Sequence, residues 1–171
     1  PFFFHKTMNP KEIVEKLEAS QEFKSFLKQN PDYYLSSIFS FKDGRNEGWK
    51  VGYYSPKKDK IVSFSLNPVS HDAPEEVFKD EAIVEKLNLE KVKIDIDNAL
   101  KICDELHSRK YAMHTCTKRF VVLQNYKQTM YNVTMITDTF NIINIKLDAE
   151  DGKVISEFLK PAMAFEQKEK K

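Results

Sequence analysis

Apolar residues recur with helical spacing in the first part of the chain. Asn9 is a typical helix N-cap, and Pro10 suits the first helical position. The apolar positions from Ile13 to Leu27 then form one stripe, which predicts a helix from about Asn9 to Gln29. A proline disfavours a helical residue before it, so Asn30-Pro31 should end this helix.

Three strands are predicted next, at residues 33–41, 49–54 and 61–66. In the second, Trp49, Val51 and Tyr53 alternate with residues of the other face, as in a half-buried strand. Asp43-Gly44 is the turn signal between the first two strands. The first part of the chain is therefore expected to be a helix followed by an antiparallel meander.

Residues 68–92 differ in composition, with two prolines and then an acidic stretch. Glu75 and Glu76 favour the positive end of a helix, and a bare loop of this length is uncommon in a compact domain. The pattern predicts a linker helix that packs against the sheet.

The first pattern then starts again. Asp95 to Lys110 is helical in spacing, and strands follow at residues 118–124, 130–137 and 140–148, with a short one at 153–158. Residues 161–171 form a charged tail that should fray.

The two halves can be compared by their alternation. The shift that takes Phe39 to Val121 also takes Val51 to Val133, so apolar positions agree in two strands, while the third is off by about one residue. The predicted fold class is α+β, with two repeats of a helix packed on a three- to four-stranded antiparallel sheet, joined by a linker helix. The predicted units are residues 1–67, the linker 68–92, residues 93–160 and the tail 161–171.

Short motifs in these strands resemble the PepSY domain. They are Trp49-x-Val51, Tyr131-x-Val133 and Leu147-Asp148-Ala149-x-x-Gly152. The second half carries the resemblance better, since the first half has Asn67-Pro68-Val69-Ser70 in place of the family's turn. Independently of the family, Gly152 can supply the positive φ that a tight turn needs.

The resemblance implies a peptide- or protein-binding module without catalytic residues, and a protease is one candidate partner. No enzyme activity and no cofactor are therefore expected. The aromatic side chains of the strands are the candidate binding residues, either as an exposed groove or packed under the helices. They are Trp49, Tyr53, Tyr54 and Tyr131, and Tyr33 and Tyr34 are further members of the possible groove.

Composition narrows the class of partner. The 171 residues include 27 Lys and Arg against 26 Asp and Glu, so the net charge of +1 gives no overall attraction to nucleic acid. No apolar run has the length of a membrane span. Two cysteines favour a reducing, cytoplasmic location, and a leader removed before Pro1 would instead imply the cell envelope or secretion.

Two alternatives to peptide binding remain. Cys103 and His107 lie four residues apart on one helix face, and His114 and Cys116 follow in a loop, so the four could bind zinc. The other interpretation of Cys103 is a small core residue. A second alternative is a self-associating structural protein, a homodimer in the simplest case, in which Phe2-Phe3-Phe4 docks on a second copy.

Overall fold

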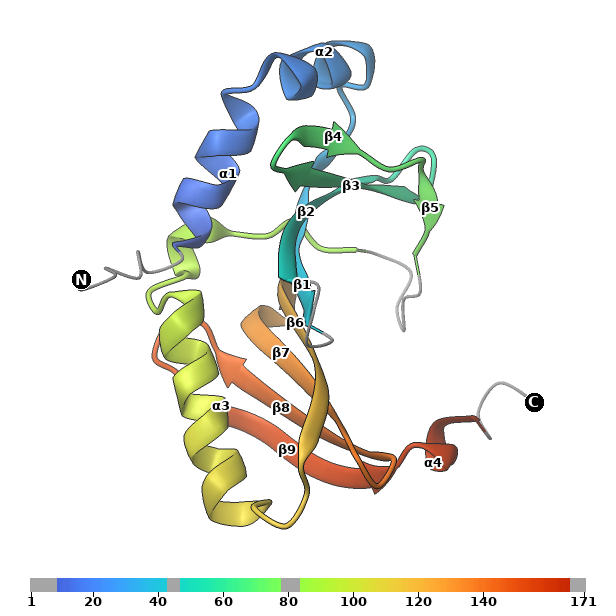
Figure 1. Cartoon of the computed structure of the whole chain (residues 1–171). Coiled ribbons are helices and arrows are strands. Elements are labelled where there is room, and N and C mark those ends of the chain that lie inside the picture. Colours follow the sequence, from blue (N-terminus) through green and yellow to red (C-terminus); the bar gives the residue numbers. More distant parts are fainter. Residues whose placement is uncertain (1–8, 43–46, 78–83, 167–171) are drawn as a thin grey trace, which may run out of the picture.

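A single antiparallel sheet runs through the whole molecule in the computed structural model, which describes residues 9–42, 47–77 and 84–166 (Figure 1). The strand order is β4-β3-β2-β1-β6-β7-β8-β9, and β5 pairs with β3 beside this path, which makes nine strands. The strands, in chain order, are β1 (Tyr34–Lys42), β2 (Glu47–Ser55), β3 (Lys60–Leu66), β4 (Val69–His71), β5 (Glu75–Glu76), β6 (Cys116–Tyr126), β7 (Gln128–Thr137), β8 (Asn141–Asp148) and β9 (Val154–Pro161).

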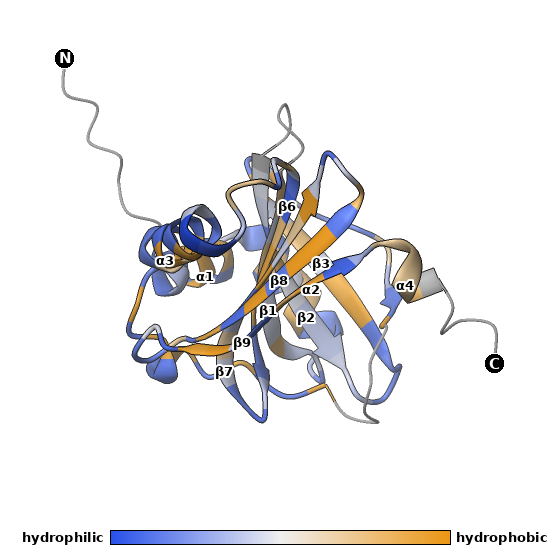
Figure 2. Ribbon diagram, turned by 90° about the horizontal axis from the view of Figure 1, so that it is seen from below, coloured by the Kyte–Doolittle hydropathy of each residue, from blue (hydrophilic) through white to orange (hydrophobic). Residues whose placement is uncertain are grey.

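Short helices complete the described part of the chain, and they are α1 (Pro10–Glu18), α2 (Gln21–Gln29), α3 (Ile96–Lys110), α4 (Met163–Glu166) and one turn of 3₁₀-helix, η1 (Leu89–Lys91). Helices α1 and α3 lie on the same side of the sheet (Figures 1 and 2). No helix in the described ranges combines the length and apolar character needed to cross a membrane.

The expectation of two helix-on-sheet repeats is wrong. Strand β1 pairs directly with β6, with Ile38 opposite Leu123, so the two halves form one sheet. The buried apolar residues from Ile13 to Ala149 also belong to one core cluster. The halves therefore share one sheet and one core, because pairing β1 with β6 satisfies two strand edges that separate repeats would leave open.

The predicted linker helix is also wrong for the residues that the structure describes. Residues 69–71 and 75–76 are strands β4 and β5, residues 84–88 are not helical, and only η1 follows. Strand β4 pairs with β3 through Phe64 opposite His71, so this segment extends the sheet edge instead of covering a face. Residues 78–83 of the predicted helix lie outside the described residues.

The phase comparison between the halves holds in one strand only. Val51 and Val133 are both fully buried in the core, as the shift requires. In β1, however, Ile38 is fully buried while Phe39 is only half-buried, because an irregularity between Leu35 and Ser37 changes the alternation. A single extra residue in a strand moves every later side chain to the opposite face.

Local signals were more reliable than the repeat. Asn9 caps α1, its side chain accepting a hydrogen bond from the amide of Lys11 at 2.9 Å, and Asp95 caps α3 through the amide of Asn98 at 2.8 Å. The predicted first helix is instead two helices, since the Ser20 side chain accepts from the Phe23 amide and starts α2. The expected Asp43-Gly44 turn lies outside the described residues.

The turn before β9 confirms the expectation for Gly152. Its φ is +74°, and its amide donates to the carbonyl of Asp148 at 2.9 Å. A Cβ at this position would lie 2.8 Å from Cδ1 of Ile102, so both the backbone conformation and the packing against α3 favour glycine.

Replacing Gly152 with alanine should lower the free energy of unfolding by about 1–3 kcal/mol, because the new side chain meets an unfavourable φ and a close contact. The measurement is thermal unfolding followed by circular dichroism. Gly48→Ala is the matched control, since a Cβ there has no atom within 4 Å. Equal effects of the two substitutions would contradict the role given to Gly152.

Candidate functional site

A groove of about 900 Å³ opens between α1, α2, the start of β1 and the segment around η1, and Tyr53 of β2 also lines it. Its volume falls in the range of ligand sites, about 300–1,000 Å³. It is formed mainly by apolar and aromatic walls with charged groups at the rim, and its lining residues are Lys11, Val14, Glu15, Glu18, Phe23, Leu27, Tyr33, Tyr34, Leu35, Tyr53, Lys86, Leu87, Asn88, Leu89, Glu90 and Asn125.

The aromatic wall of the groove is rigidly packed. The Phe23 ring lies 4.7 Å from the Tyr53 ring between centroids, and Tyr53 and Tyr33 are both almost fully buried. The hydroxyl of Tyr53 donates to Oε1 of Glu18 at 2.9 Å. Burial and the neighbouring Glu18 carboxylate raise the pKa of Tyr53 well above its usual value, so the phenol keeps its proton and this hydrogen bond.

The opposite wall is held in place by hydrogen bonds to β1. The amide of Leu87 donates to the carbonyl of Leu35 at 2.9 Å, and the hydroxyl of Tyr34 donates to the carbonyl of Val84 at 2.6 Å. These bonds fix a non-helical segment across the end of β1, opposite α1. Hydrogen bonds therefore fix the shape of the groove, whose walls come from three separate parts of the chain.

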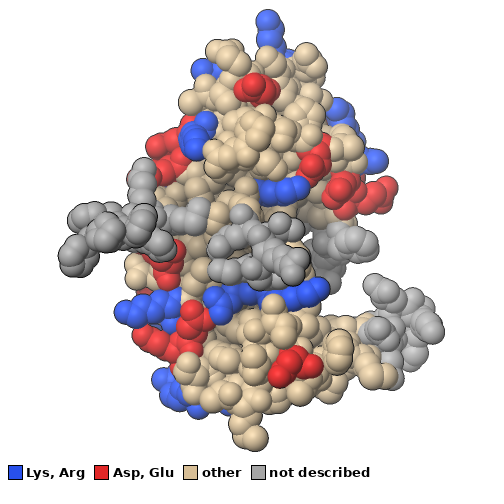
Figure 3. All heavy atoms as spheres, viewed as in Figure 1, with Lys and Arg blue, Asp and Glu red and all other residues tan. Residues whose placement is uncertain are grey.

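Charges at the rim carry both signs. Lys11 of α1 pairs with Glu90 of η1 at 3.1 Å, and both residues line the groove. Glu15 and Lys86 stand on opposite walls and are exposed, and neither side chain has an ion-pair partner among the described residues. Over the face seen in Figure 3, basic and acidic side chains occur together.

The four aromatic residues predicted to bind a ligand do not form one exposed surface. Tyr53 and Tyr131 are core residues on the helix side, and the Tyr131 hydroxyl donates to the carbonyl of Ile94 at 2.8 Å. Tyr54 is also buried, and its ring lies against Tyr34. Trp49 is half-buried against the core, so of the four only Tyr53 lines the groove.

The Cys and His residues of the zinc hypothesis are held by other contacts. Cys103 is fully buried on α3, and burial raises the pKa of its thiol to about 12. Nε2 of His107 lies 2.7 Å from the carbonyl oxygen of His114, and the Cys116 thiol donates to the carbonyl of Lys118. In the part of the chain that the structure describes, no three His, Cys, Asp or Glu side chains are grouped to hold a metal ion.

Sequence reasoning did not find most of the groove. Glu15, Glu18 and Phe23 fall within the predicted first helix, and Leu87 was expected on the apolar side of the supposed linker helix. The one available signal was the cluster of tyrosines at 33, 34 and 53, which the aromatic-groove interpretation partly captured.

Comparisons with known proteins identify the fold and no more. No protein-family model matches the chain, and no curated protein matches it. A solved structure that does match is the 1.85 Å crystal structure of a "putative lipoprotein" from Clostridium difficile 630, with a TM-score of 0.54. The match covers 92% of this chain and 97% of that one at 13% sequence identity, so it shows a shared fold and leaves function open.

Proposed function

We propose that the chain is a non-catalytic binding module that takes a peptide segment of a partner protein in the groove between α1, α2 and η1. The observation that carries the proposal is the groove itself, about 900 Å³ in volume. Its half-buried apolar lining includes Leu27, Tyr34 and Leu89, which lie over buried side chains such as Phe23 and Tyr53. Apolar walls of this kind bind the side chains of a peptide, and a few polar groups at the rim fix its orientation.

The rim chemistry supports a peptide over a purely apolar ligand. Glu15 on one wall and Lys86 on the other can each pair with a charged side chain of the opposite sign. Among the described residues that line the groove there is no Ser, Cys or His that could act as a nucleophile or a base at neutral pH. The described lining therefore lacks the Ser–His and Cys–His pairs of common hydrolases, and we propose that the groove binds a ligand.

Selection from a random peptide library displayed on phage tests this function. Wild-type protein should enrich peptides that combine apolar residues with a charged residue. Leu89→Trp, which narrows the groove, should lose them. Glu15→Gln should weaken binding of those with a basic residue by about 1.4-fold to fivefold, the factor that corresponds to one exposed ion pair of about 0.2–1 kcal/mol.

Glu22→Gln is the matched control, because Glu22 is an exposed glutamate of α2 that does not line the groove. Enriched peptides that bind wild type and Leu89→Trp equally well would contradict the proposal. A library that yields no enriched peptide at all would contradict it too.

A location at the cell envelope is part of the same proposal. The clostridial protein of the same fold carries "lipoprotein" in its description, which supports the envelope over the cytoplasm as a hypothesis. Fractionation of cells that express the natural gene tests it: recovery of the protein with soluble cytoplasmic enzymes alone would contradict an envelope location. The self-association hypothesis depends on Phe2-Phe3-Phe4, which lie outside the described residues, and stays a prediction.

A further inference from the structure

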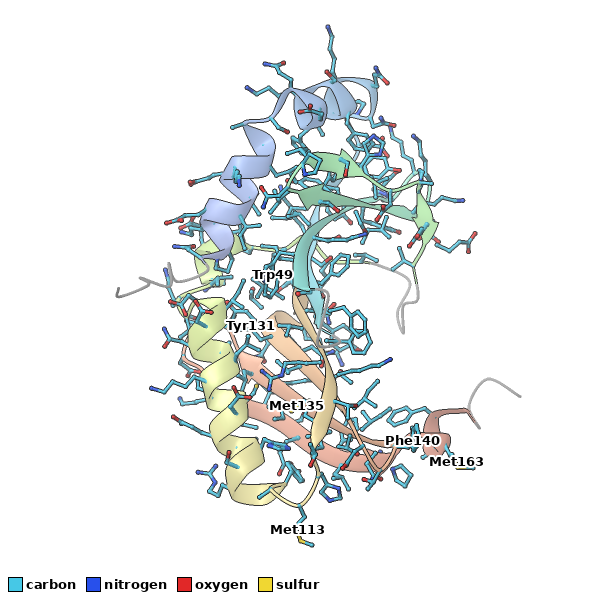
Figure 4. The ribbon with its side chains drawn as sticks, in the orientation of Figure 1. Trp49, Met113, Tyr131, Met135, Phe140 and Met163 are labelled. Atoms are coloured by element: carbon cyan, nitrogen blue, oxygen red, sulfur yellow. The ribbon has the colours of Figure 1, made fainter. Side chains whose placement is uncertain are left out.

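The most exposed large apolar side chains gather at the end of the molecule away from α2. Met113, Phe140 and Met163 are 95%, 77% and 74% exposed. They come from three separate connections: the α3–β6 loop, the β7–β8 hairpin and the segment after β9 (Figure 4). We call Met113, Phe140, Met163 and the neighbouring Phe165 the apolar tip.

Backbone hydrogen bonds hold these three connections together. The amide of Asp138 donates to the carbonyl of Thr115 at 2.9 Å, which joins the hairpin to the loop that carries Met113. The amide of Ala162 donates to the carbonyl of Phe140 at 2.9 Å, which joins the hairpin to the segment that carries Met163. The three connections are therefore joined to one another by hydrogen bonds, and the apolar side chains protrude from them.

Phe140 has no evident role inside the fold. Its φ is +56°, in the left-handed region that glycine and asparagine adopt more easily than a bulky residue. Its ring is mostly exposed, so it adds little to the core. Neither the turn nor the packing favours phenylalanine here, which points to a contact outside the chain.

Basic side chains flank the apolar tip. Lys118 and Lys160 are exposed and belong to one row across the sheet, in which Lys118 pairs with Ile136, Ile136 with Ile142 and Ile142 with Lys160. Nζ of Lys160 also lies 5.0 Å from the centroid of the Phe158 ring, which is stacked on Phe165.

Among the described side chains nearest the apolar tip, acidic ones are fewer than basic ones. Glu157 of β9 is paired with Lys110 in the last turn of α3, where Arg109 is also exposed. Asp138 in the hairpin is exposed beside Phe140. The net charge of the whole chain is only +1, so the excess of Lys118, Lys160 and Arg109 over Asp138 is a local property of the described side chains at this end.

We propose that the apolar tip docks on a lipid surface with anionic headgroups. Side chains that protrude singly from three loops do not form the flat surface that a protein partner would cover, whereas fluid lipid closes around each of them. Lys118 and Lys160 then contact the headgroups, since basic residues beside inserted apolar ones strengthen such docking. The elements that line the groove, α1, α2 and η1, lie away from α4 and the β7–β8 hairpin (Figure 1). Docking through the apolar tip therefore leaves the groove free, and the inference does not depend on the proposed function.

Sedimentation with vesicles tests the inference. The protein should sediment with vesicles of equal parts phosphatidylcholine and phosphatidylglycerol, and less with phosphatidylcholine alone or at high salt, because salt screens the lysines. The triple variant Met113→Gln, Phe140→Asn, Met163→Gln should lower the partition coefficient at least about tenfold, since full burial of even one such side chain contributes a factor of this size. Asn suits the positive φ at position 140, so this variant should fold.

Val154→Thr with Ile155→Thr is the matched control. These side chains are 44% and 41% exposed and lie at the other end of β9, so the double variant should sediment like wild type. Equal loss in both variants, or no sedimentation of the wild type, would overturn the proposal. So would concentration-dependent self-association in light scattering that the triple variant abolishes, because the tip would then bind a second copy of the chain.

Discussion

Phe64→Ala should lower the free energy of unfolding by about 3–5 kcal/mol, the cost of removing a buried phenylalanine side chain. Phe64 is fully buried in β3, and its ring lies 5.1 Å from Phe26, 5.3 Å from Phe23 and 5.7 Å from Tyr53 between centroids. Two of these rings come from α2, so the substitution opens a cavity where α2 packs on β3.

Urea unfolding measures this effect, with the fluorescence of Trp49, the chain's one tryptophan, as the signal. The control is Val154→Ala, since Val154 is exposed and its truncation should change the free energy by no more than about 0.5 kcal/mol. A loss below about 1 kcal/mol for Phe64→Ala would show that α2 does not pack on β3 as described.

The same substitution should affect ligand binding in the groove and leave vesicle docking through the apolar tip unchanged. Phe23 lines the groove and rests against Phe64, so loosening α2 should weaken any groove ligand. Met113 and Phe140 are held by bonds at the far end of the sheet and do not depend on α2. Vesicle docking by the folded Phe64→Ala protein should therefore be unchanged.

Local structure could be predicted from the sequence because its causes are local. The cap Asn9 and the turn glycine Gly152 each act within a few residues, and the structure confirms both. Asp95 caps α3 in the same local way. The break between α1 and α2 has a local signal too: Ser20 is a good N-cap in the middle of the predicted helix, and the apolar stripe hides it.

The joining of the two halves could not be predicted in the same way. Alternation tells which face of a strand is buried, and it does not tell which strand lies beside it. The pairing of Ile38 with Leu123 joins residues far apart in the chain, and the irregularity before Ser37 changes the phase that the repeat comparison relied on. A repeat hypothesis that rests only on the phase of apolar alternation therefore fails when one strand contains a single extra residue.

The groove escaped prediction for a related reason. Its walls come from α1, from β2 and from the segment before η1, and the last was expected to be a helix. Only when the chain crosses the end of β1 through the bond from Leu87 to Leu35 does a second wall face α1. No spacing within the sequence encodes that crossing.

Leu123→Ala should lower the free energy of unfolding by about 2–5 kcal/mol, and it should do so for both halves at once. Leu123 is fully buried in β6, opposite Ile38 of β1 on one side and Tyr131 of β7 on the other, and both of these are fully buried as well. It therefore packs where the two halves of the sheet meet.

Two probes at opposite ends of the sheet distinguish one cooperative unit from two. Trp49 fluorescence reports unfolding around β2, and hydrogen exchange of the β8 amides, measured by mass spectrometry, reports the other half. If one core serves the whole chain, Leu123→Ala should reduce stability equally at both probes, while Ile155→Ala at the exposed edge of β9 should change neither by more than about 0.5 kcal/mol. A loss seen at β8 alone would mean that the halves unfold separately and that the β1–β6 pairing adds little to stability. Equal losses would mean that both halves unfold in one transition. A ligand that binds the groove would then stabilise the strands beneath the apolar tip against unfolding as well.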